Sequence, residues 1–160
     1  AQYGMLISLN GFGCMLLELP VAAVTARLPA WIPMAVGTAL IGVGIAATGF
    51  VHGVVALAAT VLVWTLGEVI ASPVTHAFVA DLAPPRVQGR YQASLGFTLA
   101  LSFILAPAVG AALFGWNRTL LWIGCAGLGC AAALTFVAIG RVRRVRTVEE
   151  EMAEAEVVAE

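Results

Sequence analysis

This chain of 160 residues contains long apolar stretches without a charged residue. Counting to the next charged residue, 40 uncharged residues follow Arg27, 27 follow Arg90 and 22 follow Arg118. One helix needs roughly 20 predominantly apolar residues to cross the hydrocarbon core of a bilayer. The first stretch is long enough for two such helices, and His52 and Gly53 divide it.

The pattern predicts five membrane-spanning helices and an all-α membrane protein. Helices are preferred to strands because the apolar runs are continuous, and each backbone polar group in lipid needs a partner within its own segment. The last twenty residues change character, because they hold ten of the chain's charges. We therefore expect a membrane bundle over residues 1–146 and a cytoplasmic acidic tail over residues 147–160, either a short helix or disordered. The expected spans are residues 4–26, 31–51, 54–81, 91–114 and 118–140.

Composition supports this assignment and excludes two classes of protein. Hydrophobic residues make up 61% of the chain and charged residues 11%, whereas soluble domains carry about 25% charged residues. A soluble globular domain is therefore excluded for most of the chain. Nucleic-acid binding is excluded too, because the net charge is −1 and no basic stripe is present to neutralise phosphates.

The arginines predict the orientation. With five spans, seven of the eight basic residues fall on one side and only Arg118 on the other. Cytoplasmic loops carry the excess of positive charge, so we expect the C-terminus in the cytoplasm and the N-terminus outside. An odd number of spans that starts at Ala1 without a signal peptide further predicts a fragment of a longer protein.

Small residues predict close packing between helices. Small residues spaced four apart let two helix backbones approach, and such stripes occur in the second and fifth spans. The cysteines show no spacing typical of zinc, so we expect them to act as small apolar residues, and we expect no metal or other cofactor. The stripes are Gly42 with Ala46, Gly127 with Ala131, and Cys125 with Gly129 and Ala133; the remaining cysteines are Cys14 and Cys130.

Polar side chains share one helix face in each of three spans. A bundle that lines a water-accessible cavity would need such faces. We therefore predict that the three faces meet at a cavity. The members are Cys14 and Glu18 with Gly11 and the neighbouring Asn10 in the first span, Thr65, Glu68, Ser72, Thr75 and Val79 in the third, and Ser94, Thr98 and Ser102 in the fourth.

Glu68 is the leading candidate for function because it lies near the middle of a span. A charge at that depth costs about 2.5–3.5 kcal/mol on insertion scales, and such residues mark ion or proton pathways or form structural hydrogen bonds to a neighbouring helix. Both interpretations stay open. Glu18 is about 13 Å from Arg27 along the helix, which makes it shallower. His76 lies about 12 Å beyond Glu68, too far for a shared metal, and is expected to be a packing residue.

The loop after the third span is the most distinctive segment. Pro84 and Pro85 should end the helix, and Asp81 lies where the helix dipole disfavours a carboxylate, so Arg86 and Arg90 are its expected partners. Two interpretations stay open for this loop. It either holds the helices together as a gate, or it sets topology and carries an incidental surface ion pair of little energy.

Two segments resemble the major facilitator superfamily of transporters, in its bacterial drug-efflux-like branch. VLVWTLGEVIASPVTHAFVADLAPPRVQGRYQASLGF, residues 61–97, resembles the tenth helix, the following cytoplasmic loop and the start of the eleventh. LISLNGFGCMLLELPVAAVTARLP, residues 6–29, resembles the eighth helix. The five spans fit helices eight to twelve, which would form most of the C-terminal six-helix bundle.

The resemblance implies transport of small molecules by alternating access around a cavity at the midplane. It implies proton-coupled efflux of drug-like or amphipathic compounds across a bacterial inner membrane. Glu68 and Asn10 would face the cavity, with Glu18 as a further pathway residue, while Asp81, Arg86 and Arg90 would form the gating loop. The expected partners are the substrate, protons, membrane lipids and the missing N-terminal helices of the same chain.

Departures and alternatives accompany this resemblance. The loop has VQGR where the family commonly has an Arg before the Gly, and TARLPAW, residues 25–31, lacks the family's Asp and basic run. A non-transporting membrane scaffold stays open as an alternative. An intramembrane enzyme that uses Glu68 and His76 is disfavoured by their spacing, so we expect no catalytic residues.

Overall fold

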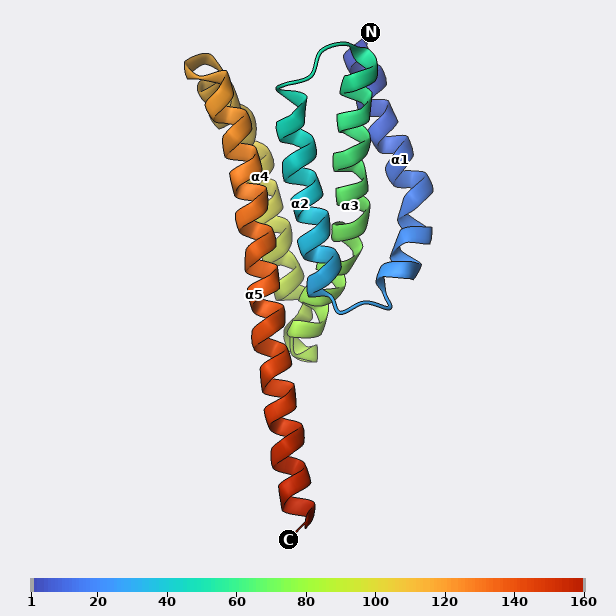
Figure 1. The fold of residues 1–160 in the computed structure, drawn as a ribbon, viewed down its shortest axis with the longest axis vertical. Coiled ribbons are helices and arrows are strands. Elements are labelled where there is room, and N and C mark those ends of the chain that lie inside the picture. The colour runs from blue at the N-terminus through green and yellow to red at the C-terminus, as the bar shows by residue number, and fades with distance from the viewer. Residues whose placement is uncertain (1, 160) are drawn as a thin grey trace.

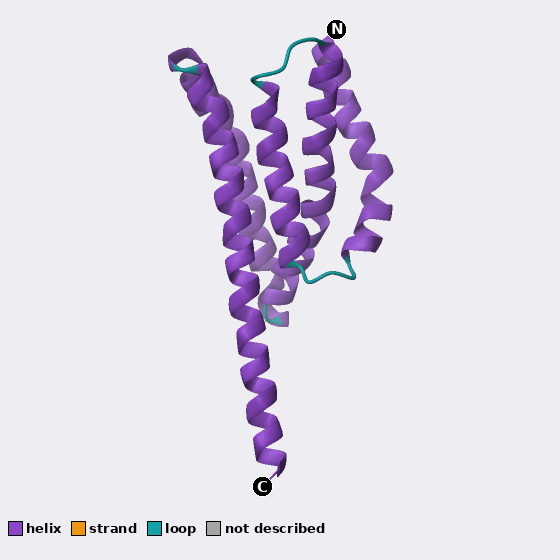
Figure 2. Cartoon of the chain, viewed as in Figure 1, coloured by secondary structure: helices purple, strands orange, loops and turns teal. Residues whose placement is uncertain are grey.

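The protein is a bundle of long helices joined by short connections (Figures 1 and 2). The computed structural model describes the backbone of residues 2–159 and the side chains of residues 4–142. No strand occurs within the described backbone. The elements are α1 (Gln2–Thr25), α2 (Trp31–Thr48), α3 (Val54–Leu82), the 3-10 turn η1 (Pro85–Val87), α4 (Gln88–Trp116) and α5 (Arg118–Ala159).

Each of the five helices is long and apolar enough to cross a membrane. The predicted fold class, an all-α multi-pass membrane protein, is thereby confirmed. Successive helices run in opposite directions, so the α1–α2 and α3–α4 connections lie at one end and the other two connections at the opposite end (Figure 1). This arrangement groups the segments that carry Arg27 and Arg86, and the assignment of their end to the cytoplasm remains a prediction.

The connections follow from local chemistry. Gly53 precedes α3 with φ of 89°, a left-handed conformation that side chains with a Cβ rarely adopt. At the other end of α3 the backbone becomes extended at Ala83, because a residue before proline is disfavoured in the helical region. The prolines therefore end α3 as predicted.

Helix α5 extends past its apolar span, Arg118–Val142, and continues without a break to Ala159. No separate helix begins at Thr147. The predicted acidic tail concerns side chains of residues 147–160, which lie outside the described side chains.

Helix α2 lies between α3 and α5 and packs against both (Figure 1). Its backbone meets the backbone of each neighbour at a glycine. A Cβ on Gly37 would lie 2.6 Å from the carbonyl oxygen of Gly67 in α3, and one on Gly42 would lie 2.7 Å from Cα of Gly129 in α5. Small residues therefore set the spacing of these three helices.

The predicted small-residue stripes differ in their contacts. The stripe with Gly129 packs against Gly42 as predicted, whereas a Cβ on Gly127 would meet no atom within 4 Å. The prediction for the Gly127 stripe is therefore wrong within the described chain. Helices α1 and α4 pack more loosely than α2, and α4 has no buried residue. The looser packing of these two helices leaves room for a cavity beside α3.

Candidate proton and substrate site

Four side chains from two helices form a hydrogen-bonded polar cluster in the bundle. The cluster consists of Asn10 and Cys14 on α1 and Thr65 and Glu68 on α3. Asn10 Nδ2 donates to Glu68 Oε2 at 2.8 Å and to Thr65 Oγ1 at 3.0 Å. The Cys14 thiol donates to the same Glu68 oxygen at 3.8 Å. Both donors from α1 thus converge on one oxygen of the carboxyl group.

The cluster lies where the backbone of α1 passes close to α3. Thr65 is 1% exposed, and a Cβ on Gly13 would lie 3.0 Å from its Cγ2. The Thr65 hydroxyl also donates to the carbonyl oxygen of Val61 at 2.7 Å. Glycine on one helix and a small, fully bonded hydroxyl on the other let Asn10 reach across to Glu68.

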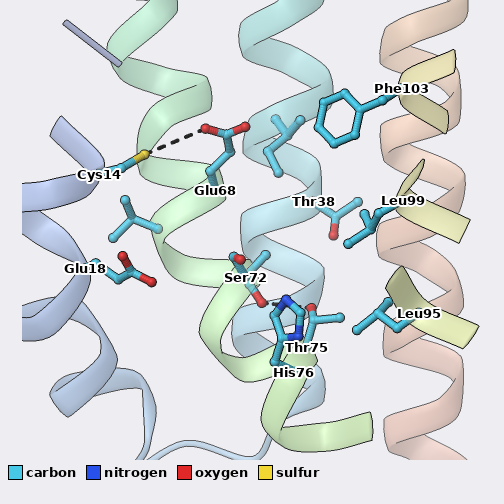
Figure 3. Close-up of a pocket in the computed structure, with 13 residues that line it drawn as sticks. Cys14, Glu18, Thr38, Glu68, Ser72, Thr75, His76, Leu95, Leu99 and Phe103 are labelled. Atoms are coloured by element: carbon cyan, nitrogen blue, oxygen red, sulfur yellow. Dashed lines mark hydrogen bonds between the residues drawn. The ribbon is translucent and has the colours of Figure 1, made fainter. Parts of the chain in front are cut away.

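A cavity of about 530 Å³ lies beside the polar cluster (Figure 3). In Figure 3, Glu68 and His76 lie toward opposite ends of it, and three apolar side chains from α4 form the wall facing them. The polar lining residues are Cys14, Glu18, Thr38, Glu68, Ser72, Thr75 and His76, and the apolar ones are Ile41, Val69, Ala71, Leu95, Leu99 and Phe103.

The charged groups in this lining are both carboxylates. Glu18 and Glu68 reach the cavity from α1 and α3, and no arginine is among its lining residues. Glu18 makes no hydrogen bond or ion pair with any described residue. A carboxylate in this position is free to attract a cation from the cavity.

The structure places the predicted polar residues unevenly. From the predicted face of α3, Glu68, Ser72 and Thr75 line the cavity, whereas Thr65 is buried beside it. Cys14 lines the cavity, as its place on the predicted polar face of the first span implied, whereas the apolar packing role expected for it is wrong, because its thiol donates to Glu68. Its position one helical turn from Asn10 was the signal for this role.

The predicted polar face of α4 is also wrong. Ser94, Thr98 and Ser102 are exposed and each donates to the carbonyl oxygen four residues earlier in its own helix. The cavity is lined instead by Leu95 and Leu99, together with Phe103. Helix α4 therefore supplies an apolar wall, whose members each follow a residue of the predicted polar face by one position in the sequence.

His76 joins α3 to the start of α4. Its Nδ1 lies 3.4 Å from Gln92 Oε1, and Gln92 Nε2 donates to the His76 carbonyl oxygen at 2.9 Å. His76 makes the predicted hydrogen-bonding contact between helices while it also lines the cavity. Gln92 was not singled out from the sequence, because a glutamine at a helix start carries no distinctive pattern.

The predicted gating loop shows no internal ion pair. Asp81, Arg86 and Arg90 are all exposed, and no ion pair joins Asp81 to either arginine among the described side chains. The loop is held to α3 by Gln88 Nε2, which donates to the carbonyl oxygen of Ala80 at 3.5 Å. The expected partners of Asp81 are therefore wrong in this conformation, and the gating role remains a prediction.

Five helices that are long and apolar enough to cross a membrane, with a carboxyl group beside an open cavity between them, fit a membrane transport protein. Residues 1–159 match the sequence model of the Major Facilitator Superfamily, and the chain belongs to this family. The chain is similar to the uncharacterized MFS-type transporter YqjV of Bacillus subtilis (strain 168), with 26% identity over 121 residues, or 74% of this chain. It spans about 29% of the length of that relative. No solved structure matches the chain.

These comparisons confirm the resemblance at the level of the superfamily. The drug-efflux branch and the numbering of the helices remain predictions.

Proposed function

We propose that the chain forms helices eight to twelve of a proton-coupled transporter that exports small amphipathic molecules across a bacterial inner membrane. The observation that carries this proposal is the placement of Glu68. Its carboxyl group lies beside an open cavity between the helices, in the middle of α3, and is held by donors from a second helix. Ionisable residues inside a membrane bundle are costly and typically form ion or proton pathways.

The hydrogen bonds suit Glu68 to reversible protonation. Asn10 and Cys14 both occupy Oε2, and no described residue bonds to Oε1. A proton arriving through the cavity therefore has an oxygen available without displacing either partner. In an alternating-access cycle the same carboxyl group would face each side of the membrane in turn and take up or release a proton there.

The lining of the cavity favours an amphipathic cation as substrate. Glu18 and Glu68 supply negative charge, and the apolar wall of α4 suits a hydrophobic body. The ring of Phe103 in that wall adds a face that attracts cations. Export is the direction that the resemblance implies, with Asp81, Arg86 and Arg90 acting as the gating loop at the cytoplasmic end.

Substitution of Glu68 tests the proposal in the complete gene product that carries these residues. Glu68→Gln keeps the shape and the carbonyl acceptor but cannot ionise. We expect it to insert normally and to lose proton-driven accumulation of ethidium in inverted membrane vesicles. Loss should exceed tenfold, because a coupling step without a titrating group cannot use the proton gradient.

Glu18→Gln is the matched control, since it removes a carboxylate from the same cavity but outside the polar cluster. It should weaken ethidium affinity and leave proton coupling intact. Unchanged proton-driven transport by Glu68→Gln, at wild-type abundance in the membrane, would remove Glu68 from the coupling role.

A further inference from the structure

The Thr65 hydroxyl has a fixed hydrogen-bonding direction within the polar cluster. A hydroxyl has one proton to donate, and Thr65 gives it to the carbonyl oxygen of Val61 at 2.7 Å. The side chain is 1% exposed, which leaves little access for water. Toward Asn10, therefore, Thr65 presents only lone pairs.

This arrangement decides which end of the Asn10 amide faces α3. An amide has a donor end and an acceptor end, and the hydrogen-bond network determines which end lies where. Opposite the lone pairs of Thr65, the acceptor end would be repelled, so the NH₂ group takes that place at 3.0 Å. The same NH₂ group lies 2.8 Å from Oε2 of Glu68.

The orientation of Asn10 has different consequences for the two protonation states of Glu68. A carboxylate accepts the bond from the NH₂ group, and a charge-assisted bond of this kind is about twice as strong as a neutral one. A carboxylic acid with its proton on Oε2 would need the acceptor end of Asn10 instead. By excluding that end, Thr65 removes one of the arrangements that would stabilise the protonated form.

We propose that Thr65 is a positioning residue for the proton site: it holds the Asn10 amide as a donor to Glu68 and so favours the carboxylate over the acid. This inference rests on the proposed coupling role of Glu68 and adds a residue that acts through Asn10. It also explains why a hydroxyl occupies a fully buried position where a valine of the same shape would fit.

The substitutions of Thr65 in the test below leave the other titratable residues near Glu68 in place. Cys14 and Glu18 face it from α1, and His76 lines the same cavity from α3. The lining residues from α2, Thr38 and Ile41, do not titrate, and neither do the α4 residues of the apolar wall. A change confined to the Thr65 hydroxyl therefore reports on the amide rather than on a rearranged set of charges.

The experiment compares Thr65→Val with Thr65→Ser in the complete protein. Valine keeps the shape and removes the hydroxyl, whereas serine keeps the hydroxyl. The measurement is the pH midpoint of tetraphenylphosphonium binding to purified protein, because protonation of Glu68 should displace the cation. We expect Thr65→Val to raise the midpoint by about one pH unit, a tenfold gain in proton affinity, and Thr65→Ser to stay within about 0.2 units of wild type.

Further measurements distinguish a positioning role of Thr65 from a packing role, and test the role of Glu68 separately. A purely structural Thr65 would change the melting temperature of the valine variant without moving its pH midpoint, and that result would overturn the inference. Glu68→Gln should remove the midpoint that Thr65→Val moves and leave only the pH dependence that Glu18 and His76 contribute, whereas an unchanged midpoint would overturn the proposed role of Glu68. If Thr65→Val fails to accumulate in membranes, Asn10→Ala removes the same donor, and an unshifted midpoint in that variant would overturn the inference equally.

Discussion

The contact between Gly42 and Gly129 offers the sharpest test of the packing. A Cβ on Gly42 would lie 2.7 Å from Cα of Gly129 and 3.3 Å from the carbonyl oxygen of Cys125, and ordinary contact begins at 3.4 Å. Both opposing atoms belong to the backbone of α5, so no side chain can rotate away. Gly42→Val must therefore push α2 and α5 apart.

The magnitude follows from a matched comparison. Gly127→Val places the same side chain within α5, where a Cβ meets no atom within 4 Å, so the helix propensity of valine affects both variants alike. The difference is the overpacking cost, about 1–3 kcal/mol. By the scaling for soluble domains of 150–250 residues, each kcal/mol lowers the melting temperature by about 2–4 °C.

Thermal unfolding of the purified complete protein measures this difference. We expect Gly42→Val to melt about 2–12 °C below Gly127→Val. Equal melting temperatures would show that α2 and α5 do not meet at this point, and would refute the account of α2 as the central packed helix.

Two further contacts outside the cavity are open to test. Asn117 Oδ1 accepts a hydrogen bond from the backbone N–H of Leu120 at 3.0 Å and so caps the start of α5. Asn117→Ala should lower the free energy of unfolding by about 1 kcal/mol because the cap is lost, whereas Asn117→Asp should retain the cap. Chemical denaturation measures both variants, and equal losses of stability would contradict the capping role. Gln92→Leu removes both contacts with His76, so amide hydrogen exchange over residues 88–95 should speed up severalfold, because each net hydrogen bond contributes about 0.5–1.5 kcal/mol. Unchanged exchange would show that other packing holds the start of α4.

The sequence predicted the helices well because the bilayer imposes a strong and simple constraint. Charged residues are rare in the hydrocarbon core because they are costly there, so the long gaps between them locate most of the spans. Local signals located the ends of α3, since Gly53 and the paired prolines restrict the backbone directly. Where no such restriction acts, as in the tail that α5 continues to Ala159, the sequence left open whether the segment is helical or disordered.

Contacts between helices were harder to predict, because they depend on how each helix is rotated and which helices are neighbours. The face of Asn10 and Glu18 and the face of Glu68 were each predicted, but their meeting joins residues 58 positions apart. The prediction from Ser94 and Thr98 was wrong because a hydroxyl in a helix can donate to a carbonyl oxygen of the same helix and needs no polar cavity. Their spacing therefore did not show which side of α4 faces the other helices.

The glycine contacts of α2 divide the bundle into parts that are held together in different ways. Helix α2 contains no acidic, basic or histidine residue, and backbone contacts such as that of Gly42 with Gly129 involve no titratable group. Between α1 and α3, in contrast, the described side-chain hydrogen bonds all converge on Glu68 or its neighbour Thr65. The polar contacts of α1 thus depend on a few side chains, whereas the contacts of α2 with α3 and α5 are set by the shape of the backbone.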